Sequence, residues 1–502
     1  MANKPNILII MTDQQRADFL QGQGFALDTM PFLEGLAPRG VWFDAAYTST
    51  PICTPARISM LTGRYAKAHG MIANWSPISA RYRQDLPETM RQQGYELALF
   101  GKNHTHVDRT RFDVWREYNH TRAPARADEA ELDAAFDAWM EDLGHWVSAE
   151  PTPFPLTSQY PVRIVSDFAG WLEQRNEDAP FFAWVSFPEP HSPYQAPAPY
   201  FDLFPLDTVP PPAAGPEVLT SKNFQWQYQY ETIKHYHPAC DSAWGRYRAN
   251  YCGMLRLIDD QLQRLVETLE SHALLQNTIV VYLSDHGDFC GDYGLYRKGL
   301  ALPQCTIRIP MLWFGGPIQP HPGAHPAHVS IVDLFPTICE AIGAPIPPGV
   351  QGRSLWPLLT GQPTSEDEFA SIYVETGIGG LVLTATDDIA YGSAADTYYV
   401  AGQARTNFDG TRVASSGYRC AVVKGRWKLI YDLQYPLELY DLQDDPFELN
   451  NLAAAAEHAA TRAELLLELL AWSIRLEDNS QVRRYAIKTA THNWLRAAGS
   501  AQ

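Results

Sequence analysis

Four short apolar segments, each followed directly by polar residues, constrain the fold of this chain more than any other feature. These segments are Ile7–Met11, Glu96–Phe100, Phe181–Phe187 and Thr278–Leu283. Because they are largely apolar on both faces, they predict strands of a buried, mostly parallel sheet. Ligands bind beyond the carboxyl ends of such strands. We therefore expect one rim of the sheet to carry the polar residues Asp13, Lys102, His191 and Asp285.

Helical patterns lie between the predicted strands. The clearest are Trp244–Leu269 and Asp333–Ile342, where apolar residues recur at helical spacing. Strands that alternate with helices are typical of the α/β class, with a large, mostly parallel sheet flanked by helices. This is the fold class that the sequence predicts.

The composition changes near residue 365. We expect residues 371–376 to form the last strand of the main sheet, and residues 378–416 are rich in Gly, Ala, Asp and Thr. A hairpin around Lys424 and Gly425 and a helix over Ala453–Leu476 follow. These features predict a large α/β domain over residues 1–376 and a small α+β domain with a polar tail over residues 377–502.

Charge and composition exclude several classes of protein. The 502 residues include 39 Lys and Arg against 57 Asp and Glu, a net charge of −18, which argues against a nucleic-acid binder. No apolar run approaches the roughly 18 residues of a membrane-spanning helix. The first apolar run is too short for a signal peptide, so we expect a cytoplasmic protein, unless a signal has been removed. Seven cysteines without a Cys-x-x-Cys pair fit free thiols.

The most informative segment runs from Cys53 to Arg64. Pro55 suits the first turn of a helix and Gly63 suits its end, which puts Cys53 at the helix N-terminus. Unpaired N–H groups there favour an anion, and Arg57 lies one turn further on. A tyrosine phosphatase loop is excluded, because only three residues separate the cysteine from the arginine. The alternative to an activated nucleophile is a buried thiol near a helix cap.

Cys53-Thr54-Pro55-Ala56-Arg57, followed by Thr-Gly-Arg, resembles the signature of the type I sulfatases, in which the cysteine is oxidised to formylglycine. Other parts of that family's pattern follow in order along the chain. They are Asp13-Gln14, Gly101-Lys102 with His104, His191, Ser284-Asp285-His286-Gly287 and Lys298. The segment from residue 427 to residue 453 also resembles the family's small domain. The resemblance spans roughly residues 4 to 455 and implies an alkaline-phosphatase-like fold whose large domain is catalytic.

The resemblance also implies a site for one divalent cation. Its ligands would be Asp13, Gln14, Asp285, His286 and an oxygen of modified Cys53, a mostly oxygen set that suits Ca²⁺, Mg²⁺ or Mn²⁺. Many sulfatases carry Asp-Asp and Asp-Asn at these two motifs. The Asp-Gln and Asp-His pairs found here resemble choline sulfatases and phosphonate monoester hydrolases instead. Ca²⁺ is the cation that the wider family implies, and the imidazole makes Mn²⁺ an alternative.

The mechanism implied by the resemblance begins with formylglycine as its hydrate. The metal and Arg57 favour one hydroxyl as an alkoxide, which attacks the bound ester, while Lys102 and Lys298 neutralise the ester oxygens. His191, with Lys298, protonates the leaving alcohol, and His104 deprotonates the second hydroxyl. The predicted activity is hydrolysis of a small-molecule or sugar sulfate ester, after maturation by a formylglycine-generating enzyme. The alternatives are a phosphonate or phosphate ester hydrolase, and a metal-binding protein without catalysis.

Several features leave alternatives open. Either Arg297 or Lys298 could face solvent, and the Gly that follows favours Lys298 as the site residue. The cluster of His235, His237 and Cys240 fits a second metal site or a loop. The aromatic segment 224–230 fits a stacking wall for a sugar or aryl group, an edge strand or an interface. We expect residues 105–160 and 190–240 to carry substrate specificity. The oligomeric state is not indicated, and a homo-oligomer stays open.

Overall fold

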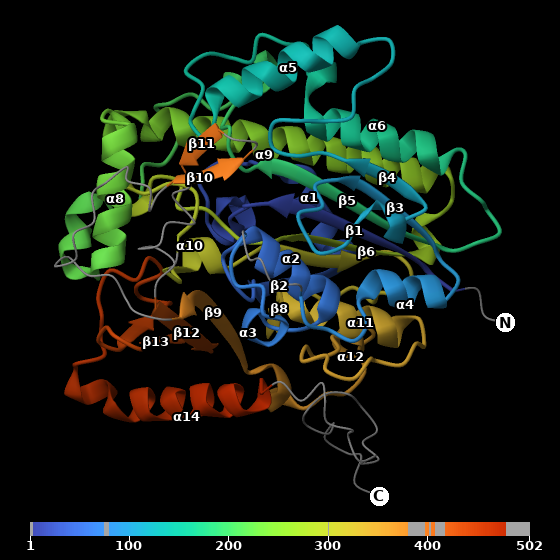
Figure 1. The fold of residues 1–502 in the computed structure, drawn as a ribbon. Helices are drawn as coiled ribbons and strands as arrows, with labels where there is room; N and C mark the ends of the chain where they lie inside the picture. The colour runs from blue at the N-terminus through green and yellow to red at the C-terminus, as the bar shows by residue number, and fades with distance from the viewer. Residues whose placement is uncertain are drawn as a thin grey trace, which may run out of the picture.

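A mixed eight-stranded sheet forms the centre of the molecule, in a computed structural model that describes residues 4–74, 80–299, 301–379, 397–400, 403–406 and 417–477. The strand order is β4-β3-β5-β1-β6-β7-β2-β8 (Figure 1). The strands are β1 (Asn6–Asp13), β2 (Gly40–Tyr47), β3 (Glu96–Gly101), β4 (Val114–Glu117), β5 (Phe181–Pro190), β6 (Thr278–Ser284), β7 (Met311–Phe314) and β8 (His325–Ser330). Strand β7 runs antiparallel to both its neighbours, and the remaining pairs are parallel. The predicted mostly parallel sheet is confirmed.

Alternate residues of strand β1 enter two separate hydrophobic cores, one on each face of the sheet. Leu8 and Ile10 belong to the first core, and Ile7, Ile9 and Met11 belong to the second. The first core is completed by α1 (Pro31–Leu36), α5 (Ala130–Leu143), α6 (Tyr160–Leu172), α8 (Phe224–Tyr236) and α9 (Cys240–Ser271). The second is completed by α2 (Cys53–Thr62), α4 (Leu86–Gln92), α11 (Leu334–Ala341) and α12 (Trp356–Leu359). Both faces of β1 are therefore buried, which explains its uninterrupted apolar sequence.

A small antiparallel sheet in the C-terminal part has the order β14-β13-β12-β9. Its strands are β9 (Ser371–Gly379), β12 (Gly417–Lys424), β13 (Trp427–Asp432) and β14 (Glu438–Asp441). Helix α14 (Ala459–Arg475) lies along this sheet (Figure 1), and its Trp472 is buried there. The hairpin around Gly425, which has a φ of 55°, is confirmed. Strands β10 (Thr397–Val400) and β11 (Gln403–Thr406) form a separate two-stranded ribbon.

The sheet assignment of residues 371–376 was wrong. These residues lie in β9, which pairs with β12 through contacts such as Val374 with Ala421, and not with the main sheet. Its side chains alternate between two cores, with Tyr373 in one and Ile372 and Val374 in the other. An apolar segment buried on both faces does not reveal which sheet it joins. The domain boundary at residue 376 stays a prediction, and most of the predicted Gly- and Ala-rich segment 378–416 lies outside the described residues.

The aromatic segment 224–230 forms the first half of helix α8, so the edge-strand alternative was wrong. Asn223 begins the helix, because its side chain accepts a hydrogen bond from the backbone N–H of Gln225 across 3.2 Å. Trp226 is buried in the first core. The remaining short helices are α3 (Ala66–His69), α7 (Ala198–Phe201) and α10 (Gln304–Ile307).

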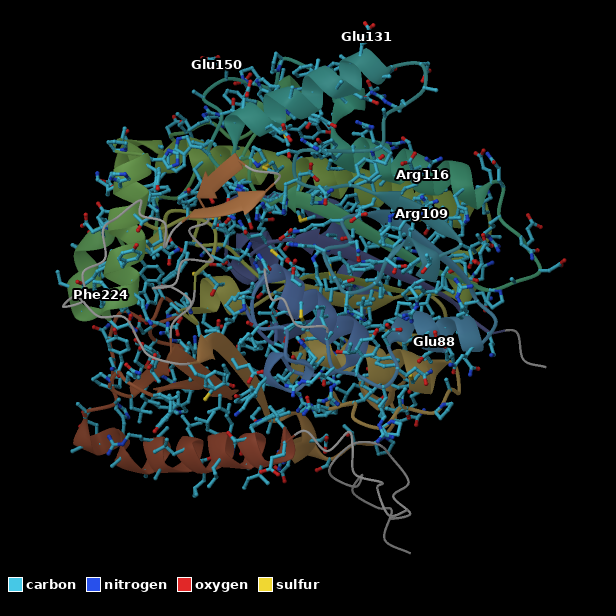
Figure 2. All side chains as sticks on the ribbon, in the orientation of Figure 1. Glu88, Arg109, Arg116, Glu131, Glu150 and Phe224 are labelled. Atoms are coloured by element: carbon cyan, nitrogen blue, oxygen red, sulfur yellow. The ribbon has the colours of Figure 1, made fainter. Side chains whose placement is uncertain are left out.

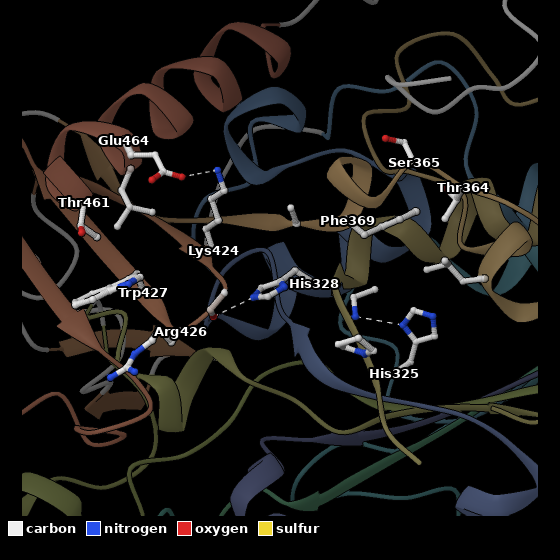
Figure 3. A pocket seen from close by; sticks show the side chains of 16 residues that line it. His325, His328, Thr364, Ser365, Phe369, Lys424, Arg426, Trp427, Thr461 and Glu464 are labelled. Carbon is white, nitrogen blue, oxygen red and sulfur yellow. Dashed lines mark hydrogen bonds and ion pairs between the residues drawn. The ribbon is translucent and has the colours of Figure 1, made fainter. Parts of the chain in front are cut away.

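Charged side chains cover the outside of the molecule, as Figure 2 shows for Arg109 and Arg116 and for Glu131 and Glu150. Within the described residues, no helix is both long enough and apolar enough to cross a bilayer. A cavity of about 740 Å³ lies between β8, the β12–β13 hairpin and α14 (Figure 3). An ion pair of Lys424 with Glu464 at 2.8 Å borders it, and none of its lining residues belongs to the predicted site.

Candidate active site

The ends of β1 and β6 bring Asp13 and Asp285 together. The two strands are parallel neighbours, and the register pairs Thr12 with Ser284, so the residue after each pair lies at the same rim. Both carboxylates are fully buried. The chain turns sharply at Gln14, with a φ of 73°, and the backbone N–H of Gln14 donates to Asp285 Oδ1 across 3.0 Å. The strand-end prediction is therefore confirmed for this pair.

Cys53 is the first residue of helix α2, as its sequence predicted. The preceding Ile52 is extended, and Gly63 ends the helix in the left-handed conformation with a φ of 62°. Cys53 Sγ lies 3.2 Å from His286 Nε2 and 3.7 Å from Asp13 Oδ1. Although burial and Asp13 oppose ionisation, Lys102 and Lys298 hold the pKa of this thiol well below its usual range. An anion is therefore stabilised at this position.

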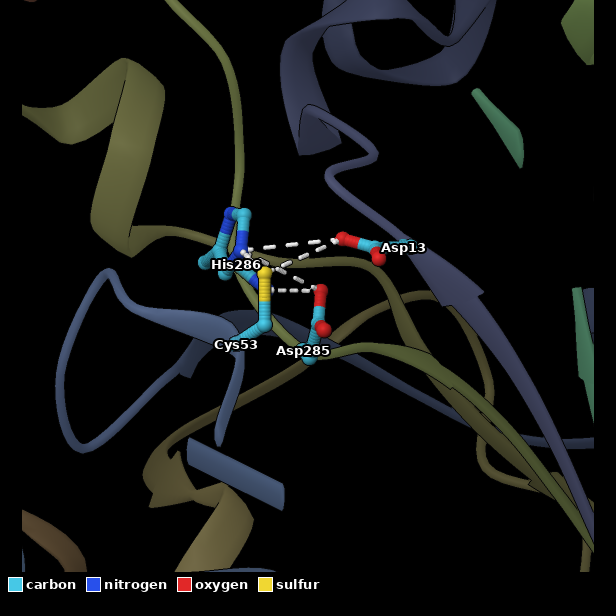
Figure 4. A group of neighbouring side chains, drawn as sticks. All are labelled: Asp13, Cys53, Asp285 and His286. Atoms are coloured by element: carbon cyan, nitrogen blue, oxygen red, sulfur yellow. Dashed lines mark hydrogen bonds and ion pairs between the residues drawn. The ribbon is translucent and has the colours of Figure 1, made fainter. Parts of the chain in front are cut away.

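Asp13, Cys53, Asp285 and His286 point toward one another (Figure 4), and one ligand atom of each lies within 4.8 Å of the others. All four residues are buried. The donor set of two carboxylates and one imidazole fits a divalent cation. An oxygen in place of Sγ would increase the preference of this donor set for hard cations. Within the described residues, this is the only group of His, Cys, Asp and Glu close enough to hold a metal ion.

Arg57 fixes helix α2 to the strand ends. Its Nε donates to Asp285 Oδ2 across 2.7 Å, and its Nη1 donates to the backbone oxygen of Lys102 and to Ser186 Oγ. Its Nη2 lies 3.8 Å from Asp13 Oδ2 and makes no hydrogen bond within the described residues. One guanidinium donor is thus left at the site.

Two buried lysines lie at the site, Lys102 beside the carboxylate of Asp13 and Lys298 beside the amide of Gln14. Lys102 Nζ contacts Asp13 Oδ2, and Lys298 Nζ donates to Gln14 Oε1 across 2.9 Å. Burial alone would raise the pKa of Asp13, but Lys102 and Arg57 hold it well below the usual range, so this carboxylate is ionised. Arg297 and Lys298 are both buried, so the expectation that one of them faces solvent was wrong.

His191 and His104 lie beside these lysines. The His191 ring contacts the backbone oxygen of Ser192 through Nδ1 at 2.8 Å, so a neutral ring carries its proton on Nδ1 and leaves Nε2 unprotonated. Burial and the nearby His120 and Lys298 hold the pKa of His191 well below its usual value. His104 is half-buried with a φ of 50°, and burial and Lys102 lower its pKa as well.

Four further residues lie at the site that no sequence motif predicted. They are His120, Ser186, Tyr194 and Asp288. The ring of His120 stacks on His191 with centroids 3.7 Å apart, and its Nε2 lies 2.9 Å from Lys102 Nζ. Asp288 comes two residues after His286 and was the one position that the neighbouring motif could have revealed.

The predicted cluster of His235, His237 and Cys240 does not converge on a metal site in the described structure. His237 stacks on Trp146 with centroids 3.9 Å apart and an angle of 6° between the rings. Cys240 is buried at the start of α9. The loop alternative was also wrong for two of the three residues, because His235 lies in α8 and Cys240 begins α9, while His237 lies between the two helices.

A family model described as Sulfatase matches residues 5–344 of the chain. This chain belongs to the sulfatase family. It is a sulfuric ester hydrolase with the fold of the alkaline-phosphatase-like superfamily, as the resemblance implied.

Two curated sulfatases and one solved structure are similar to this chain. An arylsulfatase of Clostridium perfringens is 28% identical over 71% of the chain and 78% of its own length. A choline-sulfatase of Rhizobium meliloti is 26% identical over 98% of the chain and 92% of its own length. The solved phosphonate monoester hydrolase of Silicibacter pomeroyi covers 95% of the chain and 97% of its own, with a TM-score of 0.74 and 22% identity. This last likeness shows the shared fold.

Proposed function

We propose that this sulfatase hydrolyses a monoester of sulfuric acid through a formylglycine made from Cys53, with one divalent cation bound beside it. The observation that carries the proposal is the convergence of Asp13, Asp285 and His286 on Cys53 at the N-terminus of helix α2. In the overall reaction, the bond between sulfur and the alcohol oxygen breaks. Water supplies one oxygen to the sulfate and one proton to the alcohol.

The cation would be held by Asp13, Asp285, His286, the amide oxygen of Gln14 and an oxygen of residue 53. The wider family implies Ca²⁺ as the cation, and the imidazole of His286 makes Mn²⁺, or Mg²⁺, an alternative. When bound, the cation supplies positive charge that polarises oxygen atoms. Formylglycine that has added water would supply two hydroxyls on one carbon, one for attack on the ester and one for release of the product.

The chain's own residues bind the anionic ester and move protons. Lys102 and Lys298 neutralise the non-bridging sulfate oxygens, and Arg57 presents its unbonded Nη2 to the same charge. An anion bound between these groups raises the pKa of His191, so its Nε2 acquires the proton that the leaving alcohol receives. His104 is the half-buried base for the release step. The proposal includes a formylglycine-generating enzyme as the partner that matures Cys53. The seven buried free cysteines fit a cytoplasmic enzyme.

A second candidate function is hydrolysis of a phosphonate or phosphate ester on the same scaffold. The observation in its favour is the neutral ligand Gln14 together with the imidazole of His286. This pair lowers the negative charge of the site, compared with a site of carboxylates alone. The lower charge favours a phosphate monoester most, because it carries more negative charge near neutral pH than a sulfate or phosphonate monoester.

The test compares the two esters on matured enzyme, produced together with a formylglycine-generating enzyme. We expect kcat/KM for 4-nitrophenyl sulfate to exceed that for 4-nitrophenyl phenylphosphonate, and the Cys53→Ala variant to hydrolyse neither. Faster phosphonate hydrolysis would favour the second candidate. If protein with an intact Cys53 hydrolyses neither of these esters nor any other sulfate ester, the result would favour a metal-binding protein without catalysis.

A further inference from the structure

The side-chain amide of Gln14 lies between two groups with opposite hydrogen-bonding demands. On one side, Lys298 Nζ donates to Gln14 Oε1 across 2.9 Å. On the other side, Gln14 Nε2 donates to Asp288 Oδ2 across 2.5 Å and to the Tyr194 hydroxyl across 2.8 Å. An ammonium can only donate and a carboxylate can only accept. Both contacts therefore select the same one of the two amide orientations.

Asp288 is held in place from three directions. The Tyr194 hydroxyl donates to its Oδ2 across 2.7 Å, and the Tyr247 hydroxyl donates to both oxygens at 3.0 Å. The backbone N–H of Cys290 donates to Oδ1 across 2.7 Å. All four side chains in this group, counting Gln14, are buried. Because a backbone N–H cannot accept, Oδ1 is fixed toward Cys290 and Oδ2 is left to face Gln14.

We propose that Asp288 is a positioning residue that orients the Gln14 amide, so that its oxygen faces Lys298 and the bound cation. The inference rests on one part of the proposed function, which is the presence of a bound cation. It explains how a neutral amide can serve at a ligand position where many sulfatases carry a carboxylate. Either oxygen of a carboxylate can bind a cation, whereas an amide presents an oxygen only when a second group holds its nitrogen.

The test exchanges acceptor and donor at position 288. In Asp288→Asn, the backbone N–H of Cys290 donates to the carbonyl oxygen of the new amide. The NH₂ group of that amide therefore faces Gln14. Gln14 must then turn its oxygen toward Asn and its own NH₂ group toward the cation. We expect Ca²⁺ and Mn²⁺ to bind about 10- to 100-fold more weakly in calorimetric titration of the metal-stripped, full-length protein.

A second exchange restores the complementary pair. In the double variant Gln14→Glu with Asp288→Asn, the NH₂ group at position 288 donates to one carboxylate oxygen, and the other oxygen faces Lys298 and the cation. We expect this double variant to recover most of the cation affinity that Asp288→Asn loses. Asp259→Asn is the matched control, because Asp259 is buried and accepts hydrogen bonds from the backbone N–H groups of Phe32 and Leu33, and it has no hydrogen bond to Gln14 or Asp288 within the described residues. Its cation affinity should stay unchanged.

Three results would overturn the inference: unchanged affinity in Asp288→Asn, no recovery in the double variant, or no cation binding by the unaltered protein. Failure of the inference and failure of the proposed function can be told apart. If the unaltered protein binds cation and hydrolyses sulfate esters while Asp288→Asn binds equally well, only the role of Asp288 falls. If the affinities follow the expected pattern but no ester is hydrolysed, only the proposed function falls.

Discussion

Arg57 Nε donates to Asp285 Oδ2 across 2.7 Å, with both side chains fully buried, and this pair fixes the first turn of helix α2 to the end of strand β6. The contact sets the position of Cys53 relative to the two carboxylates that follow β1 and β6. It joins segments that are 228 residues apart in the sequence. The position of Cys53 beside Asp13 and Asp285 therefore depends on one arginine.

Arg57→Ala should damage both stability and catalysis. Removing one partner of a buried pair leaves Asp285 without its counter-charge, which costs about 3–5 kcal/mol of the free energy of unfolding. We expect kcat to fall about 10²- to 10³-fold as well, because a donor at the anion is lost. Urea unfolding and 4-nitrophenyl sulfate kinetics measure the two effects. Arg353→Ala, which breaks the buried pair with Asp333, is the control that should lose stability but keep kcat. Full activity in Arg57→Ala would contradict this role.

Removal of the divalent cation should destabilise the fold. The folded chain holds Asp13, Asp285 and His286 together, whereas the unfolded chain does not, so a cation bound there stabilises the folded state. Addition of Ca²⁺ at about 100 times its dissociation constant should raise the free energy of unfolding by about 2.7 kcal/mol. Scanning calorimetry of chelator-treated protein with and without Ca²⁺ measures this. An unfolding temperature that ignores every divalent cation would count against the metal site.

His120 should act on catalysis through two different neighbours. His120→Phe keeps a ring against His191 but removes the acceptor for Lys102, so kcat/KM should fall by a similar factor for all sulfate esters. His120→Ala also removes the ring, so its loss should grow as the leaving alcohol becomes less acidic. Rates for 4-nitrophenyl and phenyl sulfate separate the two. If kcat/KM falls by the same factor for both esters in both variants, the effect of His120 does not act through His191.

Glu189 should make the protein less stable as the pH rises. Burial raises its pKa to about 8, with a smaller effect of the charge on Asp13, and neither carboxyl oxygen has a hydrogen-bond partner within the described residues. In the unfolded chain this carboxyl ionises near pH 4.3. Between these two values the folded protein holds one more proton than the unfolded chain. The free energy of unfolding should then fall by about 1.4 kcal/mol per pH unit.

Glu189→Gln tests this pH dependence, because it keeps the shape of the side chain without the ionisation. Urea unfolding of both proteins at pH 5, 6.5 and 8 gives the comparison. The variant should gain stability relative to the unaltered protein at pH 8 and differ least at pH 5. Parallel curves over this range would show that Glu189 does not titrate between the folded and unfolded states.

Local sequence predicted the parts of the site that local chemistry determines. Pro55 and Gly63 marked the two ends of helix α2, and the polar residues after β1 and β6 marked the rim. The sheet that β9 joins was not predictable, because its partner β12 lies about forty residues further along, and both candidate sheets would bury it. His120 was missed for a related reason. It follows β4, which pairs Glu117 with Gly101 at the same rim, and this four-residue edge strand was not predicted.

Helix α8 shows how composition can mislead. Alternating aromatic and polar residues in segment 224–230 are typical of a strand, and aromatic residues favour strands. Asn223 was the local sign of a helix start, since asparagine is a strong N-cap residue. The packing of Trp226 into the core then outweighs the propensity of the segment.

The state of residue 53 is the central claim, and a single mass measurement tests it most directly. The tryptic peptide from Gly40 to Arg57 contains Cys53 and no other cysteine. In protein produced together with a formylglycine-generating enzyme, we expect this peptide to be lighter by about 18 Da than the unmodified sequence requires. A peptide that keeps the full mass of an intact thiol, in protein that still hydrolyses sulfate esters, would contradict the account.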